Sequence, residues 1–327
     1  MATDASKTTL LAALGANTGI AIAKFCGAAY SGSSAMASEG IHSLVDTGNQ
    51  ILLLFGLKDA SRPADAPHPF GYGLRLYFWA FVVSVAIFAL GSGLTIHEGL
   101  AKIDRPTPIS HAWVNMLILA VSILLEGTSL LVAIKAVKKE ARNRSLSFLE
   151  TLRTHRDPTI FAVVYEDTAA IAGLLVALAG TMLALVLDMP VIDGWTSIII
   201  GLILAVAAIS LARRCYTLLT GQAADPAIEE RLREILGQIT VIDHVNEVRT
   251  MHFGPSEVLL IVSADFRDDT PAAIVKRIVA QVDEKMRDAF EDVRRVYLEA
   301  QSIQSHLEVL DDLGEEADAL ARDNVDS

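Results

Sequence analysis

The chain has 327 residues and a formal net charge of −12, yet 52% of it is hydrophobic and its mean hydropathy is +0.42. The acids are concentrated at one end: residues 225–327 hold 24 acids and 11 bases, whereas residues 1–224 hold 15 acids and 16 bases. An apolar part therefore precedes an acidic part, which excludes a disordered chain, a nucleic-acid binder with a basic face and a small disulfide scaffold.

The first part contains six apolar stretches that are long enough to cross a membrane as helices. They cover residues 8–30, 33–57, 76–97, 112–136, 159–187 and 190–212. Basic residues gather in the loops at 58–75 and 135–156, so the positive-inside rule places these loops and both termini in the cytoplasm. The sequence predicts an α-helical, multi-pass membrane protein with six transmembrane helices.

The acidic part has the pattern of a small α/β domain. One helix is predicted from Asp225 to about Gln238, and a second, amphipathic helix from Thr270 through Phe290. Alternating residues predict strands at Val248–Phe253, Val258–Phe266 and Arg294–Glu299, with a turn at Gly254-Pro255-Ser256. This order predicts a compact sheet with its helices on one face.

Three segments follow from these patterns. Residues 1–219 form the six-helix transmembrane domain, residues 220–302 the cytoplasmic α/β domain, and residues 303–327 an acidic C-terminal tail. The apolar residues of the tail suggest an amphipathic or frayed helix. A solvated end is favoured over an arm that collects metal, because acidic surfaces most often serve solubility.

Polar side chains inside the second span indicate the chemistry. Glu39, His42, Asp46 and Asn49 are spaced by three, four and three residues, so they lie along one helix face. His42 and Asp46, one turn apart, offer a nitrogen and a carboxylate to one point, which suits zinc above all, or iron, cobalt or manganese. The alternative is a hydrogen-bonded cluster between helices.

Further charges lie in the other spans. The fifth span carries the adjacent acids Glu166 and Asp167, which point about 100° apart, so at most one is expected to face the same centre. Glu126 lies in the fourth span, and Lys24 in the first either snorkels or pairs with an acid and is given no site role.

At these residues the chain resembles a known family, the cation diffusion facilitators. The motifs are the run Ser34–Asp46, then Arg62–Asp65 and His68–Gly73, while Glu126–Ala133 and Glu166–Ala170 are similar to the branch of zinc transporter nine, found in mitochondria and with bacterial relatives. The resemblance implies a dimeric six-helix metal/proton antiporter with a cytoplasmic ferredoxin-like, metallochaperone-like dimerisation domain.

The resemblance also implies a metal site with two ligands from each of two spans. His42, Asp46 and Asp167 match three of these positions, but the fourth falls on Val163, which cannot bind metal. Either water, Asn49, Glu166 or Glu126 then completes the shell, or the affinity for metal is lower and the selectivity broader than in members with four ligands.

Two further sites of the family are incomplete in this chain. A secondary loop site keeps Asp65 and His68 but has Tyr72 where a further histidine would stand. The cytoplasmic domain lacks the family's zinc ligands, with positions such as Asn246 and Val262 in their place, so it is expected to act without bound zinc.

The function expected from the sequence is export of divalent cations, most of all Zn²⁺, from the cytoplasm in exchange for protons by alternating access. The bilayer of a bacterial inner membrane, a second copy of the chain, the metal ion and protons are the expected partners. Nucleic acid, a resident cofactor and an enzymatic activity are not expected. The alternatives are broader efflux of Fe²⁺, Mn²⁺ or Co²⁺, or a regulatory membrane protein that no longer transports.

Overall fold

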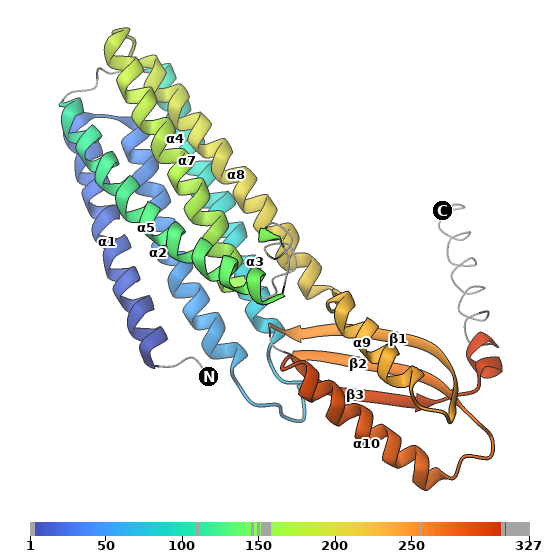
Figure 1. The fold of residues 1–327 in the computed structure, drawn as a ribbon. Coiled ribbons are helices and arrows are strands. Elements are labelled where there is room, and N and C mark those ends of the chain that lie inside the picture. The colour runs from blue at the N-terminus through green and yellow to red at the C-terminus, as the bar shows by residue number, and fades with distance from the viewer. Residues whose placement is uncertain are drawn as a thin grey trace, which may run out of the picture. The chain divides into compact units, whose positions relative to one another are not determined.

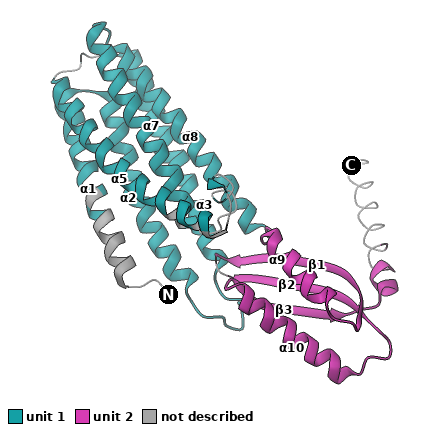
Figure 2. Ribbon diagram, viewed as in Figure 1, with its two compact units in different colours: residues 1–220 teal, residues 221–327 magenta. Residues whose placement is uncertain are grey.

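A computed structural model of the chain describes residues 4–106, 108, 111–144, 147, 148, 151, 158–255, 257–308 and 311. The chain divides into two compact units, residues 1–220 and residues 221–327 (Figure 2). Most of the tail predicted for residues 303–327 lies outside the described residues, as do nine residues of the basic loop predicted at 135–156. The first part of that predicted loop, through Arg144, is helical. Of the tail, residues 303–308 are helical.

Unit 1 is a bundle of long helices that run side by side (Figure 1). Its elements are α1 (Asp4–Ser31), α2 (Ser34–Ala60), α3 (Leu74–Ala86), the π-helical segment η1 (Ile87–Ser92), α4 (Gly93–Asp104), α5 (Ala112–Arg144), α7 (Pro158–Val186) and α8 (Val191–Leu219). The elements α3, η1 and α4 follow one another without a break, so together they form one long helix.

Four stretches of the described chain are long and apolar enough to cross a membrane, judged by length and composition. They are Leu74–Asp104, Ala112–Lys139, Ile160–Val186 and Val191–Leu219, and they correspond to the third to sixth predicted spans. The first two predicted spans form α1 and α2, which are not among these four stretches of the described residues. In α2 the polar stripe from Glu39 to Asn49 lowers the hydropathy, and the prediction of six spans stays a prediction.

The turn between α1 and α2 is closed by a carboxylate from α8. Gly32 takes a positive φ of 70°, and the Ser33 hydroxyl caps α2 by accepting from the Met36 amide. Asp193, which is fully buried in the first turn of α8, accepts from the Ser33 hydroxyl at 2.8 Å and from the Ser34 amide at 2.6 Å. A negative charge at a helix N-terminus is favourable, so this contact ties α8 to α2.

Glycines let α4 and α8 approach closely. A Cβ added at Gly99 would lie 2.7 Å from the carbonyl oxygen of Gly194, and a Cβ at Gly194 would lie 2.8 Å from the carbonyl oxygen of Gly99. Small residues at such a crossing allow backbones to meet, which is a common way for helices to associate in membranes.

Unit 2 is a three-stranded sheet with two helices. Its elements are α9 (Pro226–Gly237), β1 (Ile242–Gly254), β2 (Glu257–Phe266), α10 (Ala272–Ala289) and β3 (Val293–Ala300). The strand order is β1-β2-β3, with β1 antiparallel and β3 parallel to the central β2.

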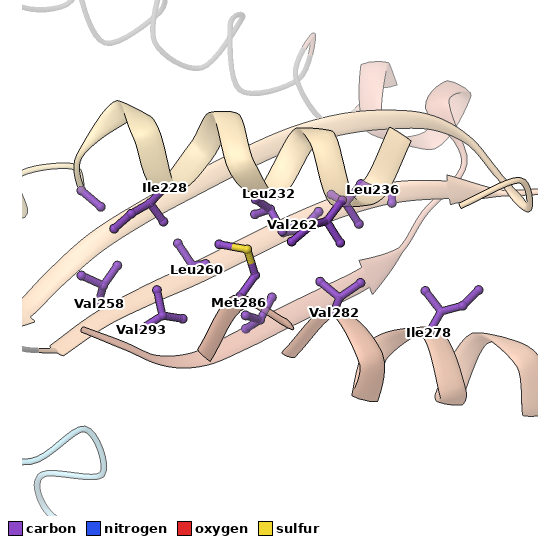
Figure 3. Packing of buried hydrophobic residues seen from close by; sticks show 14 residues of the cluster. Ile228, Leu232, Leu236, Val258, Leu260, Val262, Ile278, Val282, Met286 and Val293 are labelled. Atoms are coloured by element: carbon purple, nitrogen blue, oxygen red, sulfur yellow. The ribbon is translucent and has the colours of Figure 1, made fainter. Parts of the chain in front are cut away.

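Side chains from α9, β2 and α10 converge in the core of this unit (Figure 3). Alternate residues of β2, from Val258 to Ala264, join this cluster, and Leu232 of α9 and Met286 of α10 are fully buried in it. Since α9 and α10 also contact each other, both helices lie on one face of the sheet, as expected from the element order.

The element order of unit 2 matches the sequence prediction, but β1 begins earlier than predicted. It starts at Ile242, six residues before Val248, and its pairing with β2 shifts register between Ile242 and His244 and between Val245 and Glu247. Such irregularities break the alternation of inward and outward residues, so the pattern becomes visible only after the second of these two shifts. Ser256, in the predicted turn, lies outside the described residues.

We predict that Gly99→Ala lowers the thermal stability of the detergent-solubilised protein. The added methyl group collides with the α8 backbone, and overpacking of this kind costs about 1–3 kcal/mol. The matched control is Gly19→Ala in α1, where an added Cβ meets nothing within 4 Å and alanine favours the helix. Melting temperatures of the two variants should therefore move apart; equal values would show that the α4–α8 contact is not tight.

Candidate metal centre

The polar stripe of α2 faces the interior of unit 1. Glu39, His42, Asp46 and Asn49 are all buried, with exposed fractions between 0% and 8%. The Nε2 atom of His42 lies 3.5 Å from Oδ2 of Asp46, as their spacing of four residues predicts.

The stripe meets α7 through a hydrogen bond. The side-chain nitrogen of Asn49 donates to Oε1 of Glu166 over 3.2 Å. A small cavity of about 10 Å³ lies beside this contact and is lined by His42, Asp46 and Glu166 together with apolar residues from η1, α7 and α8. A volume of this order accommodates one water molecule or one ion.

Two further acids approach from neighbouring elements. Asp167 of α7 accepts a hydrogen bond from the side chain of Ser129 in α5, whereas its neighbour Glu166 faces α2. Glu126, one turn before Ser129, is buried and lies within electrostatic range of Asp46, Glu166 and Asp167.

Several nitrogen and oxygen atoms that could bind a metal ion have no hydrogen-bond partner among the described residues. They are both ring nitrogens of His42, Oδ1 of Asp46 and Oδ2 of Asp167. Buried polar atoms are nearly always hydrogen-bonded in folded proteins, so orphaned imidazole and carboxylate atoms together are typical of ligand positions. One imidazole with several carboxylates is a donor set that suits zinc and related divalent cations.

In this conformation the side chains of the cluster do not form a complete metal site. Within the described part of the chain, no three His, Cys, Asp or Glu side chains are close enough together to hold one ion. The structure thus gathers the predicted residues on facing helices without closing a coordination shell. The ligand set of His42, Asp46 and Asp167, with Asn49, Glu126 or Glu166 as completion, stays a prediction.

Two apolar clusters lie on either side of the polar stripe. One contains Ala35 and Met36 near the start of α2, with residues of α5, α7 and α8; the other contains Leu53 near its end, with residues of α3, α7 and α8. The polar cluster thus lies between two buried apolar clusters. In such an apolar environment the charged side chains of the polar cluster interact more strongly with one another than they would in water.

The loop between α2 and α3 holds the predicted secondary pair. Asp65 accepts from the amide of His68 at 2.9 Å and from the hydroxyl of Tyr72 at 2.6 Å, and Nδ1 of His68 lies 3.4 Å from the same carboxylate. The hydrogen bond from Tyr72 lowers the pKa of the Asp65 carboxyl and raises the pKa of the Tyr72 hydroxyl.

Of the two alternatives predicted for Lys24, the structure shows pairing with an acid. Lys24 of α1 forms an ion pair with Glu39 at 3.1 Å and donates to the hydroxyl of Ser43 at 2.8 Å. A lysine within an apolar stretch indicates that a partner is needed. Which acid becomes that partner depends on the orientation of α1 about its axis relative to α2, which the sequence does not give.

The chain is similar to several known proteins. Residues 10–220 match the family described as the cation efflux transmembrane domain. Metal tolerance protein C4 of Arabidopsis thaliana is 34% identical over 72% of this chain and 52% of that protein. The mitochondrial proton-coupled zinc antiporter SLC30A9 of Xenopus laevis is 32% identical over 90% of this chain and 52% of that protein. A nickel form of the MamM CTD matches 24% of this chain and 98% of that chain, with 12% identity and a TM-score of 0.22.

The apolar helices and the buried polar cluster define an integral membrane protein with an acidic α/β unit after its helices. The chain belongs to the cation efflux family, also called the cation diffusion facilitators, in the branch of zinc transporter nine. The resemblance seen in the sequence is thereby confirmed. The chain spans about half the length of the curated relatives it matches.

We predict that Val163→Asp strengthens zinc binding by the purified protein. The new carboxylate stands one turn before Asp167 and supplies the missing ligand, which should lower the dissociation constant at least about tenfold, since even groups outside the coordination shell change metal affinity by that factor. Competition with a zinc-binding dye measures the affinity. Val163→Asn, of matched size but without charge, is the control, and equal affinities for the two variants would exclude Val163 from the ligand position.

Proposed function

We propose that the chain is a secondary active transporter that exports divalent metal cations, Zn²⁺ above all, from the cytoplasm in exchange for protons. The observation that supports this is the buried donor cluster between α2, α5 and α7. It places His42 and Asp46 beside an ion-sized cavity, with Glu126, Glu166 and Asp167 around them. The membership of the cation efflux family points to the same function.

The charge of this cluster explains why protons and metal would exchange there. Carboxylates inside an apolar bundle are costly unless they are neutralised. Lys24, the nearest buried cation among the described residues, is already engaged by Glu39. The remaining acids therefore need a cation from outside, and either a metal ion or protons can supply the charge. Metal ligands must be deprotonated to bind, so the two compete for one site.

The transport cycle follows from this competition. An inward-facing state loads a metal ion from the cytoplasm at His42, Asp46 and Asp167. The helices then rock to expose the site to the other side, protons displace the metal, and the protonated site returns. The apolar clusters around Met36 and Leu53 are the natural barriers at the two ends of the site.

Zinc is the favoured cargo. An imidazole with carboxylates suits it, and the Xenopus relative is named a zinc antiporter. The missing ligand at Val163 is the reason to test Fe²⁺, Mn²⁺ and Co²⁺ as competitors. Absence of flux for every metal would support the alternative of a regulatory membrane protein.

The proposal includes the location and assembly that the family implies. The protein would act as a homodimer in a bacterial inner membrane, with both termini in the cytoplasm and without a resident cofactor. The basic loops at 58–75 and 135–156 support this orientation.

We predict that His42→Ala and Asp167→Ala abolish proton-driven zinc uptake into proteoliposomes. Each removes one of only three matched ligands, which should reduce the initial rate at least about tenfold. A zinc-sensitive dye inside the vesicles reports uptake, and a pH-sensitive dye reports the opposing proton flux.

His97→Ala is the control, because this exposed histidine of α4 lies outside the cluster. The variants Glu126→Gln and Glu166→Gln, assayed with competing metals, identify which acid completes the shell. Uptake by His42→Ala or Asp167→Ala at the wild-type rate would refute the proposal.

A further inference from the structure

The ion pair between Lys24 and Glu39 is completely buried, with exposed fractions of 0% for both side chains. Lys24 bridges Glu39 and Ser43, which are one turn apart on α2, so its ammonium group is held from two sides. Removing two charges from water is expensive, and a buried pair of this kind is weak evidence for a gain in stability. Its place in the bundle therefore requires another explanation.

The pair is adjacent to the predicted metal ligands. Glu39 precedes His42 by three residues on the same face of α2, which is about 4.5 Å along the helix axis. Lys24 lies within electrostatic range of His42, Asp46 and Glu126. Any change in the charge of the pair is thus felt by the donors of the metal centre.

One oxygen of Glu39 remains free of hydrogen bonds among the described residues. Its Oε1 atom faces α7 at Gly173, where an added Cβ would lie only 2.7 Å away. The other oxygen is held by Lys24. Glu39 is therefore a fully buried carboxylate, one turn from His42, that would be available for coordination if Lys24 did not hold it.

We propose that Lys24 is a positioning residue that keeps Glu39 out of the metal coordination shell, and that this pair sets the affinity and selectivity of the transporter. The inference rests on the proposed function. With the pair intact, its net charge is zero, and the metal ion is bound only by the predicted ligands, without Glu39. That set binds a cation loosely enough to release it in every cycle.

The two halves of the pair have opposite effects on a bound cation. Without Lys24, Glu39 adds a carboxylate ligand, so metal binds more tightly and leaves more slowly. The added carboxylate oxygen also shifts the preference toward harder cations such as Mn²⁺, because hard cations bind oxygen ligands well. Without Glu39, the ammonium group is uncompensated and repels the metal ion.

The test compares Lys24→Met, Glu39→Gln and the double variant in proteoliposomes. We expect Lys24→Met to lower both KM and kcat for zinc, and Glu39→Gln to raise KM, each at least about fivefold, as coupled neighbouring groups commonly do. Lys24→Met should also make Mn²⁺ a stronger competitor of zinc uptake. The double variant, which buries no unpaired charge, should return KM to within about twofold of the wild type.

Two controls separate positioning from a purely structural role. Lys24→Arg keeps the charge and should preserve the KM and the metal preference. Lys102→Met removes another buried lysine, which contacts the carbonyl of Gly32 in the same unit, and should leave the KM unchanged. If Lys24→Met does not fold, as judged by gel filtration, Glu39→Gln and the double variant still decide the question.

A double variant whose KM stays about fivefold or more away from the wild-type value would overturn the inference, as would an unchanged KM and metal preference in Lys24→Met. Failure of the proposed function looks different, because then wild-type vesicles take up no metal or His42→Ala takes it up normally. The two results are thus distinguishable in one set of vesicles.

Discussion

Charged side chains inside an apolar bundle must find partners, and this requirement governs how the helices of unit 1 meet. Lys24 reaches Glu39 and Ser43, which fixes the rotation of α1 against α2. Asp193 of α8 reaches the first residues of α2, which fixes the start of the same helix. Because a buried charge without a partner costs several kcal/mol, these contacts allow few alternative packings. The polar stripe of α2 is consequently presented to α7 and not to lipid.

Close backbone contacts complement these polar contacts. The Gly99–Gly194 crossing joins α4 to α8, and Gly173 makes room in α7 for the carboxylate of Glu39. The π-helical segment η1 contributes Ile87 to the lining of the cavity beside His42. Segments of this kind are common at functional sites, since they change the side chains that a long helix presents. Glycines and the π-helical segment thus shape a small polar chamber within a bundle of otherwise regular helices.

Much of this arrangement could be predicted from periodicity. The spacing of the α2 stripe placed its four polar residues on one face, and the apolar stretches located the long helices. The start of β1 could not be predicted, because its register shifts hide the alternation before Val248. The partners of Lys24 and Asp193 could not be predicted either, since both contacts join helices whose rotation depends on the packing of the whole bundle. Neighbouring residues of a helix point about 100° apart, so Glu166 and Asp167 were expected to point in different directions. Only the structure shows that Glu166 faces α2 and Asp167 faces α5.

The excess of acids around the cavity links the architecture to the proposed exchange of metal ions for protons. In unit 1 the charges nearly cancel by count, but they do not cancel in space. Most of the bases lie within residues 58–75 and 135–156, while Asp46, Glu126 and Glu166 are buried together. Had Lys24 been free to neutralise one of these acids, a built-in cation would compete permanently with metal and protons. Its pairing with Glu39 leaves the cluster dependent on mobile cations. A site that must always contain a cation, but contains no fixed one of its own, is suited to exchanging one kind of cation for another.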